Sequence, residues 1–383
     1  MTVVRFPRAE LTAQLASRVR RGPPVLVCGP PGCGKTQLLL DVAGALEAEG
    51  WRAVYLDLMT AASCPDRLVR AALEALPVED FGERLESAVE MQRLASAGRA
   101  NGSRAVNSLL GLWAGLDTAR GRAVALLFDE ATEVKSLAYY TGLREIEQGL
   151  GRALARRERG TVLATSYPTL ACRAWPDLEL FRVPRLSPAE LTDATAAVGW
   201  DAGALAGASD GSPRYARLLL EAAGAEGLPS VWAREMAHGG RLDVACRRTW
   251  ETLLLRSRGY GMSKAVLDAV AREEGLNLTA LVGRLGRTPG AVGDYLSWLL
   301  GVDALERVRK RYFYVDRVLA HWVRLHGRGR LPTPAELAAA ASAACAVSEA
   351  QPHPPPAEPR AEGQKRKAPP APQRRPDTLM EID

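Results

Sequence analysis

Short, fully apolar runs alternate with helical patterns along the first half of the chain. The runs lie at residues 25–28, 53–56, 123–128, 161–164 and 178–183. Runs of this length without polar alternation are typical of strands buried on both faces of a parallel sheet, with helices as the crossover connections. The pattern over residues 1–185 therefore predicts an α/β domain built on a parallel sheet.

The pattern becomes helical at residue 186 and stays so to residue 240. Ser187, Pro188 and Glu190 are typical of a helix start, with an N-cap serine, a proline at the first helical position and an acid in the first turn. A second helix is expected to begin at residues 211–213, Gly-Ser-Pro. We expect residues 186–240 to form a small helical lid.

Three helices and a β-hairpin are expected over residues 244–330. The helices are predicted to begin at Ser263, Leu278 and Thr288. Two alternating segments follow, at residues 305–308 and 312–315, on either side of a basic turn. This order predicts a winged helix-turn-helix domain.

The end of the chain has a different composition. An Ala-rich helix is expected over residues 331–350. From residue 351 to 383 the chain is rich in Pro and has few large apolar side chains, so it cannot offset the entropy of ordering. We expect a disordered tail there. Its apolar-acidic terminus, residues 377–383, suits capture by a protein partner, and the alternative is a solvated tail without a partner.

A phosphate-binding motif follows the first apolar run. Residues 29–36 match the G-x-x-x-x-G-K-[ST] pattern between a strand and a helix, which is the context that the motif requires. Lys35 can reach the β- and γ-phosphates of ATP, and the Thr36 hydroxyl can bind Mg²⁺. The residues expected to contact the nucleotide are Gly29, Pro30, Pro31, Gly32, Cys33, Gly34, Lys35, Thr36 and Gln37.

An apolar strand at residues 123–128 ends in Asp129 and Glu130. An aspartate at this place can bind Mg²⁺, and the glutamate after it can polarise the attacking water. We expect Thr36 and Asp129 to hold the metal ion and Glu130 and Lys35 to take part in ATP hydrolysis.

A polar pair, Thr165 and Ser166, ends the next apolar run. We expect Thr165 beside the γ-phosphate, and the alternative is that these hydroxyls cap the following turn. Together with residues 129–132 the pair also echoes helicase motifs. A helicase needs a second nucleotide-facing domain, which the remaining sequence does not predict.

Composition limits the partners. The net charge of +6 and the pI of about 9.1 permit a nucleic-acid partner without requiring one. The six cysteines form no CxxC pair, so neither a disulfide framework nor a zinc site is predicted. The sequence contains no run approaching the roughly 18–20 apolar residues of a membrane helix, and no signal-peptide pattern. We expect a soluble, cytoplasmic protein without membrane contact.

The order of these features resembles that of AAA+-type ATPases. It most resembles the archaeal-type ATPases of the STAND group and their relatives, the origin-recognition initiator ATPases. Residues 6–11, 186–190 and 312–316 resemble the family's N-terminal segment, the start of its lid and the segment after its wing. The resemblance covers about residues 5–325 and implies ATP-driven switching, often by oligomerisation, with the winged helix on DNA or protein.

The resemblance also implies roles for two arginines. Arg214 aligns with the lid motif in which initiators place a sensor arginine, so it would touch the γ-phosphate; the alternative is a surface arginine. Arg173 is the arginine of residues 166–180 and would be a finger acting in trans, a feature that many relatives lack.

Basic residues gather on the predicted winged helix. They can straddle a duplex, with the third helix in the major groove and the wing on phosphates. Because that helix carries short side chains and Asp294, backbone contacts would dominate. The candidates for DNA contact are Arg284, Arg287, Arg307, Arg309, Lys310 and Arg311. Two functions stay open: a DNA-associated ATP-driven switch, and a STAND-type signalling adaptor whose winged helix contacts protein.

Overall fold

A computed structural model gives the structure of the chain and describes residues 4–96, 101–257, 259–327 and 329–346. The predicted disordered tail lies outside these residues. Within the described ranges, no helix is long and apolar enough to cross a membrane.

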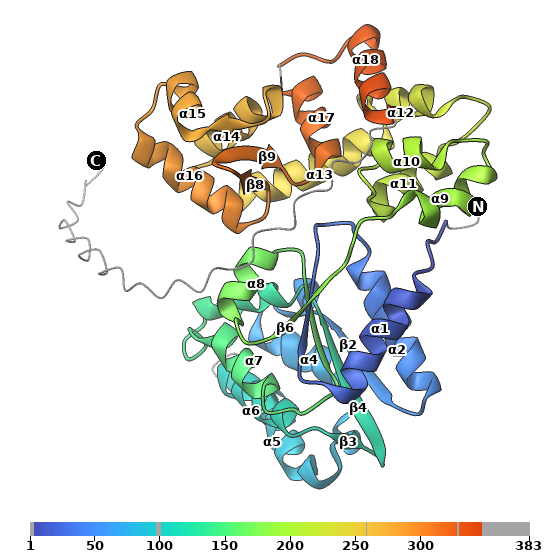
Figure 1. Ribbon diagram of the computed structural model, residues 1–383. Coiled ribbons are helices and arrows are strands. Elements are labelled where there is room, and N and C mark those ends of the chain that lie inside the picture. Colours follow the sequence, from blue (N-terminus) through green and yellow to red (C-terminus); the bar gives the residue numbers. More distant parts are fainter. Residues whose placement is uncertain (1–3, 97–100, 258, 328, 347–383) are drawn as a thin grey trace, which may run out of the picture. The chain divides into compact units, whose positions relative to one another are not determined.

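A parallel sheet lies at the centre of the first half of the chain (Figure 1). Its strands are β1 (Val25–Cys28), β2 (Arg52–Asp57), β4 (Arg122–Asp129), β5 (Thr161–Thr165) and β6 (Glu179–Arg182). Their spatial order is β2-β4-β5-β1-β6, and the short β3 (Thr118–Ala119) pairs antiparallel with β4. The predicted parallel α/β sheet is confirmed, and its order places β1 and β4 on either side of β5.

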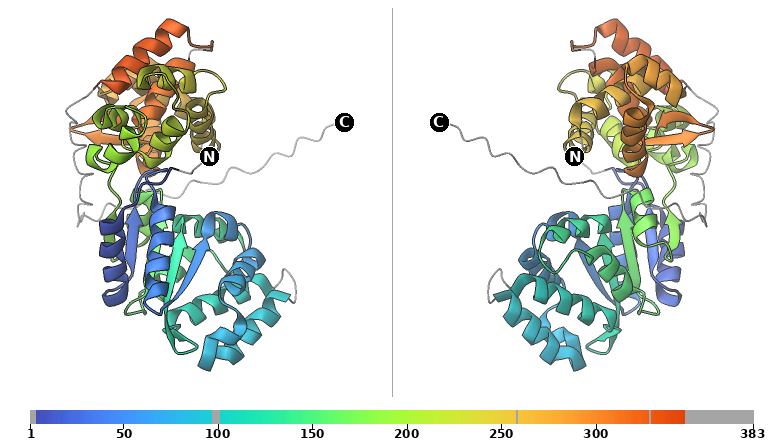
Figure 2. Two further views of the ribbon diagram at one scale, coloured as in Figure 1. Left: turned by 90° about the vertical axis from the view of Figure 1, so that its right-hand side faces the viewer. Right: turned by 90° about the vertical axis from the view of Figure 1, so that its left-hand side faces the viewer.

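Side chains alternate between the two faces of the sheet, and helices cover both faces (Figure 2). Val162 and Ala164 of β5 pack on the first face, against α1 (Ala9–Arg21) and α2 (Lys35–Ala48). Leu163 packs on the opposite face. That second face is covered by η3 (Ala131–Tyr139) and by α3 (Leu58–Ala61), α4 (Pro65–Ala75), α5 (Leu85–Ser96), α6 (Gly102–Ala114), α7 (Ile146–Leu154) and α8 (Pro168–Ala174).

Residues 186–346 form the C-terminal half, drawn from green to red in Figure 1. Its first helices are α9 (Pro188–Ala196), α10 (Ala202–Ala208), α11 (Pro213–Glu221), α12 (Leu228–Met236) and α13 (Arg241–Leu255). The predicted start of α9 is confirmed, because Ser187 and Glu190 form a capping box.

The next elements are α14 (Tyr260–Arg272), β7 (Leu276–Asn277), α15 (Leu278–Leu285), α16 (Pro289–Gly301), β8 (Leu305–Val308), β9 (Arg311–Tyr314), α17 (Arg317–His326) and α18 (Pro334–Cys345). The predicted helix start at Ser263 is wrong, since α14 begins at Tyr260 and Ser263 is buried inside it. The second strand begins at Arg311, one residue earlier than predicted. The reason is that Val308 pairs with Arg311 across a two-residue turn.

One hydrophobic cluster runs through the whole C-terminal half. It extends from Leu186 to Cys345 and includes buried side chains of the predicted lid, of the hairpin and of α18. Because α18 packs against α10 and α12, the end of the described chain returns to the predicted lid. The boundaries at residues 240, 244 and 330 therefore lie within shared packing, and the division into domains stays a prediction.

Candidate nucleotide site

The glycine-rich loop at residues 29–34 joins the carboxyl end of β1 to the N-terminus of α2. Gly32 and Gly34 have φ values of 81° and 97°, a region that side chains disfavour. A Cβ atom on Gly32 would also come within 2.9 Å of the Arg214 Cβ. The loop thus needs glycine, and it leads into a helix N-terminus, whose free N–H groups attract anions.

Lys35 is buried, with only 4% of its surface exposed. Its Nζ donates hydrogen bonds to the Gly29 carbonyl (3.0 Å), the Pro30 carbonyl (3.2 Å) and the Ser166 Oγ (2.9 Å). The carbonyl partners belong to the loop itself. The ammonium is therefore held against the loop.

Asp129 lies at the carboxyl end of β4 and collects two hydroxyl groups. Its Oδ2 accepts hydrogen bonds from Thr36 Oγ1 (2.5 Å) and from the Tyr55 hydroxyl (3.0 Å). Burial, and next the Asp129 charge, raise the pKa of Tyr55, so this phenol stays a donor. Carboxylate and hydroxyl oxygens are the donors that Mg²⁺ prefers, so the residues present fit this ion.

Glu130 has a left-handed backbone, with φ of 47°, which is uncommon for a residue with a side chain. Its Oε2 accepts from the Ser166 backbone N–H at 3.0 Å, and its Oε1 accepts from the Ser166 hydroxyl. The same Oε1 lies 4.0 Å from the Lys35 Nζ. Ser166 therefore connects Lys35 to Glu130.

Thr165 takes a different position from the one expected. Its Oγ1 lies 3.0 Å from the Thr132 Oγ1 and accepts a hydrogen bond from the Tyr167 N–H at 3.0 Å. This is the turn-capping alternative. Because side chains alternate along β5, Thr165 shares the face of Leu163, whereas Ser166 follows Ala164 onto the face of α2. We therefore replace Thr165 by Ser166 as the candidate beside Lys35 and Glu130.

The two arginines singled out from the sequence have different surroundings. The Arg214 backbone N–H donates to the Gly32 carbonyl (3.3 Å), but its guanidinium donates to Ala245 O (2.9 Å) and Thr249 Oγ1 (3.2 Å) on α13. Arg173 is exposed on α8, and its charge acts on Asp303 of the same chain.

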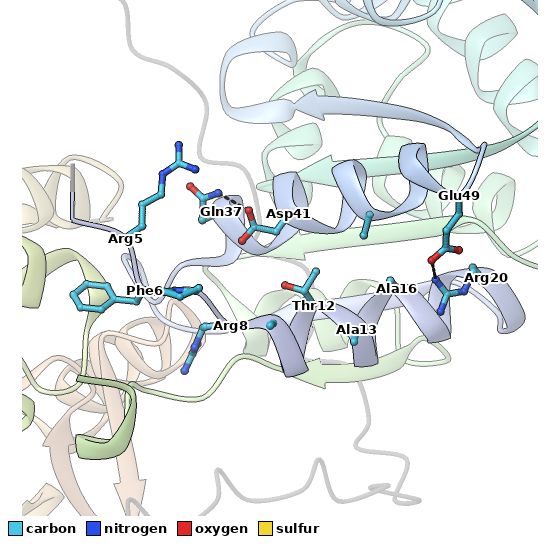
Figure 3. A pocket seen from close by; sticks show the side chains of 13 residues that line it. Arg5, Phe6, Arg8, Thr12, Ala13, Ala16, Arg20, Gln37, Asp41 and Glu49 are labelled. Atoms are coloured by element: carbon cyan, nitrogen blue, oxygen red, sulfur yellow. Dashed lines mark hydrogen bonds and ion pairs between the residues drawn. The ribbon is translucent and has the colours of Figure 1, made fainter. Parts of the chain in front are cut away.

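A groove of about 490 Å³ lies between α1, α2 and the segment before α1 (Figure 3). Phe6 and Arg5 line one end of it, near Gln37 and Asp41. Gln37 donates from Nε2 to Asp41 Oδ1 at 2.8 Å. Of the other expected contacts, Pro30, Pro31 and Cys33 line a small cavity against the C-terminal half, where burial raises the pKa of the Cys33 thiol.

The six basic candidates for DNA contact differ in their surroundings. Arg284 pairs with Glu273 (2.5 Å), and Arg311 donates to the Gly275 carbonyl (2.9 Å). Arg309 and Lys310 are exposed at the tip of the hairpin, both with a left-handed backbone (φ of 48° and 69°). The remaining two, Arg287 and Arg307, are also exposed.

No protein-family model matches the chain, and none of the curated proteins matches it. Among solved structures, it is similar to the Walker-type ATPase of Pyrococcus abyssi, with a TM-score of 0.63 and 15% identity over 84% of this chain and 96% of that chain. At this identity the likeness shows the fold alone.

Two further solved structures have lower scores. Cdc6p from Pyrobaculum aerophilum is 14% identical over 90% of this chain and 96% of that chain, with a TM-score of 0.39. DnaA from Aquifex aeolicus, bound to AMPPCP, is 13% identical over 78% of this chain and 89% of that chain, with a TM-score of 0.37. These TM-scores are too low to support an inference. From the first likeness, the chain has the fold of a P-loop ATPase.

Proposed function

We propose that the chain binds ATP with Mg²⁺ and hydrolyses it to ADP and phosphate. The observation that carries this proposal is the meeting of four side chains from two segments: Lys35 and Thr36 at the start of α2, and Asp129 and Glu130 at the end of β4. A P-loop fold without this set would support nucleotide binding only.

Binding rests on the glycine-rich loop. Its backbone N–H groups and the N-terminus of α2 hold the phosphates, and Lys35 exchanges the Gly29 and Pro30 carbonyls for phosphate oxygens. Gln37 lines the groove of Figure 3 and directly follows Thr36, so the sugar and base are proposed to lie on this side of the phosphates.

Hydrolysis then depends on Glu130. A bound Mg²⁺, held by Thr36 and Asp129, would offset the negative charge that develops on the phosphates. The Glu130 carboxylate takes a proton from the attacking water as the water oxygen bonds to the γ-phosphorus and the bond to the β-phosphate bridging oxygen breaks. In this structure the carboxylate is bonded to Ser166, on the side of Lys35, and it turns toward the water when it acts as the base.

Comparison of two lysine variants tests the proposal. Lys35→Ala is expected to lose binding of Mg-ATP in a calorimetric titration, because the loop cation is gone. Lys135→Ala removes an exposed lysine of the same charge, paired with Glu147 at 3.9 Å, and is expected to bind as the wild type does. Equal nucleotide affinity in the two variants would refute the site.

The role of this ATP hydrolysis is best described as that of a switch that associates with duplex DNA and can self-associate. Helices α14–α16 with the β8–β9 hairpin have the order of a winged helix, which would lay α16 in a groove and the hairpin tip on phosphates. On this proposal Arg214 leaves Ala245 and Thr249 to reach the γ-phosphate, and Arg173 serves a neighbouring copy.

Charge reversal at the hairpin tip tests the DNA contact. Arg309→Glu combined with Lys310→Glu should weaken duplex binding at all sequences alike and flatten its salt dependence, as loss of phosphate contacts does. The control is Arg70→Glu with Arg156→Glu, two exposed residues of the sheet domain. Equal loss in both pairs would mean that bulk charge alone binds the DNA.

A signalling adaptor is the second candidate. The exposed Asp294 on α16 favours it, because a carboxylate repels phosphate on the face that would enter the groove. On this alternative the hairpin and α16 contact a protein, and the charge reversal leaves duplex binding unchanged.

A further inference from the structure

Two side chains of the C-terminal half contact the segment that directly follows β5. The first is Arg256, at the end of α13. Its Nη1 donates to Glu133 Oε1 (2.7 Å) and to the Tyr167 hydroxyl (3.1 Å), and its Nη2 approaches Glu133 Oε2 at 3.3 Å. The guanidinium also lies over the Tyr167 ring, 5.6 Å from its centroid. A planar fork with this many partners fixes the geometry of all three residues.

The second side chain is Asp303, in the turn after α16. Tyr167, at the N-cap of α8, offers no side-chain cap. Asp303 supplies one from a distance: its Oδ2 accepts from the Thr169 N–H (3.0 Å) and its Oδ1 from the Thr169 hydroxyl (2.6 Å). Its own backbone is left-handed, with φ of 53°, so the chain is strained where it presents this carboxylate.

Both contacts act next to the pair formed by Glu130 and Ser166. Tyr167 is the residue after Ser166, and Glu133 lies one turn beyond Glu130, its N–H bonded to the Glu130 carbonyl at 2.9 Å. Arg256 therefore holds the two chain segments that carry Glu130 and Ser166.

In the arrangement that Arg256 holds, the Glu130 carboxylate already has hydrogen-bond partners. Both carboxylate oxygens of Glu130 accept hydrogen bonds from Ser166. A carboxylate that accepts from one residue with both oxygens is held facing that residue, so it is not turned toward an attacking water. Freeing Glu130 requires the Ser166 segment to move, and Arg256 and Asp303 oppose that movement.

We propose that Arg256 is a positioning residue that restrains ATP hydrolysis by pinning Glu133 and Tyr167 around the Glu130–Ser166 pair. The proposal rests on the ATPase function above and assigns its regulation. Displacement of the C-terminal half, for instance on binding its partner, breaks the Arg256 contacts and raises turnover.

Steady-state turnover by the full chain is the first test. Arg256→Ala should raise kcat by about threefold or more, the rate equivalent of losing a partly exposed ion pair, while KM stays within about twofold. Glu133→Gln should do the same, and the double variant should exceed neither single variant, because both break one contact. Arg248→Ala, an exposed arginine on the same helix, is the control and should match the wild type. A kcat at or below the wild-type value in Arg256→Ala overturns the proposal.

Hydrogen exchange gives a readout that does not need activity. In Arg256→Ala, and in Asp303→Asn, the backbone amides of residue 167 and residues 169–172 should exchange faster than in the wild type. In Asp294→Asn, a matched change on α16, they should not. Unchanged exchange in Arg256→Ala would show that the Arg256 side chain does not stabilise this segment. Faster exchange without a rise in kcat would show that Arg256 does not restrain hydrolysis. If the wild type neither binds nor hydrolyses ATP, the proposed function itself fails, even where the exchange results hold.

Discussion

Replacement of Glu130 by glutamine separates ATP binding from hydrolysis. The amide keeps the size of the carboxylate, and its oxygen can still accept one of the two hydrogen bonds that Ser166 donates. It loses the basicity that removes a proton from water. Loss of a general base lowers rates by roughly 10²–10⁴, which corresponds to about 3–5 kcal/mol in the barrier.

ATP binding by this variant should not weaken. Glu130 Oε1 lies 4.0 Å from the Lys35 Nζ, on the side where the phosphates would lie. Without its negative charge, this side chain no longer competes with the phosphates for the Lys35 ammonium. Mg-ATP should therefore bind as tightly as in the wild type or somewhat more tightly.

Phosphate release and calorimetric titration measure the two effects on the same preparation. Glu158→Gln, at an exposed position of the sheet domain, is the control and should leave both unchanged. Hydrolysis by Glu130→Gln within about threefold of the wild type would refute the assignment of the base, since a residual rate of that size leaves no room for general-base catalysis.

Four further predictions concern stability. Arg157 is 2% exposed and donates to Thr161 Oγ1 (3.0 Å) and Val124 O (2.8 Å), so Arg157→Ala should lower the free energy of unfolding in urea by about 3 kcal/mol; a loss under 1 kcal/mol would mean that water replaces the side chain. Burial lowers the pKa of His321 to about 4. Because the unfolded chain takes up that proton first, stability should fall as pH drops from about 6.5 to 4, by up to about 3 kcal/mol, and His321→Gln should flatten this slope. Burial raises the pKa of Asp303 to about 6. Between about pH 6 and 4 the folded chain therefore takes up this proton before the unfolded chain does, which offsets part of the loss of stability. Asp303→Asn should make the fall in stability steeper. Arg309→Asn with Lys310→Gly should raise stability by about 1 kcal/mol, because asparagine and glycine tolerate the left-handed turn; unchanged or lower stability would show that the turn is not strained.

The sequence determined the parts of this protein that depend on neighbours along the chain. The glycine-rich loop is recognisable because a strand, eight motif residues and a helix follow one another without interruption. Fully apolar runs indicated a parallel sheet, since strands buried on both faces cannot alternate. Ser187 and Glu190 gave the start of α9 for the same local reason, a side chain bonded to a backbone three residues away.

The tertiary structure decided everything that depends on which face of an element meets which neighbour. Thr165 and Ser166 are equivalent in the sequence, and only the position of α2 on one face of the sheet brings Ser166, not Thr165, to Lys35. The contacts of the Arg214 guanidinium with two oxygen acceptors on α13 were likewise decided by packing. Arg256 gave no local signal at all, since its partner Glu133 precedes it by more than a hundred residues. Periodicity and motifs describe order along the chain, whereas such contacts arise from the packing of distant elements, which local patterns do not encode.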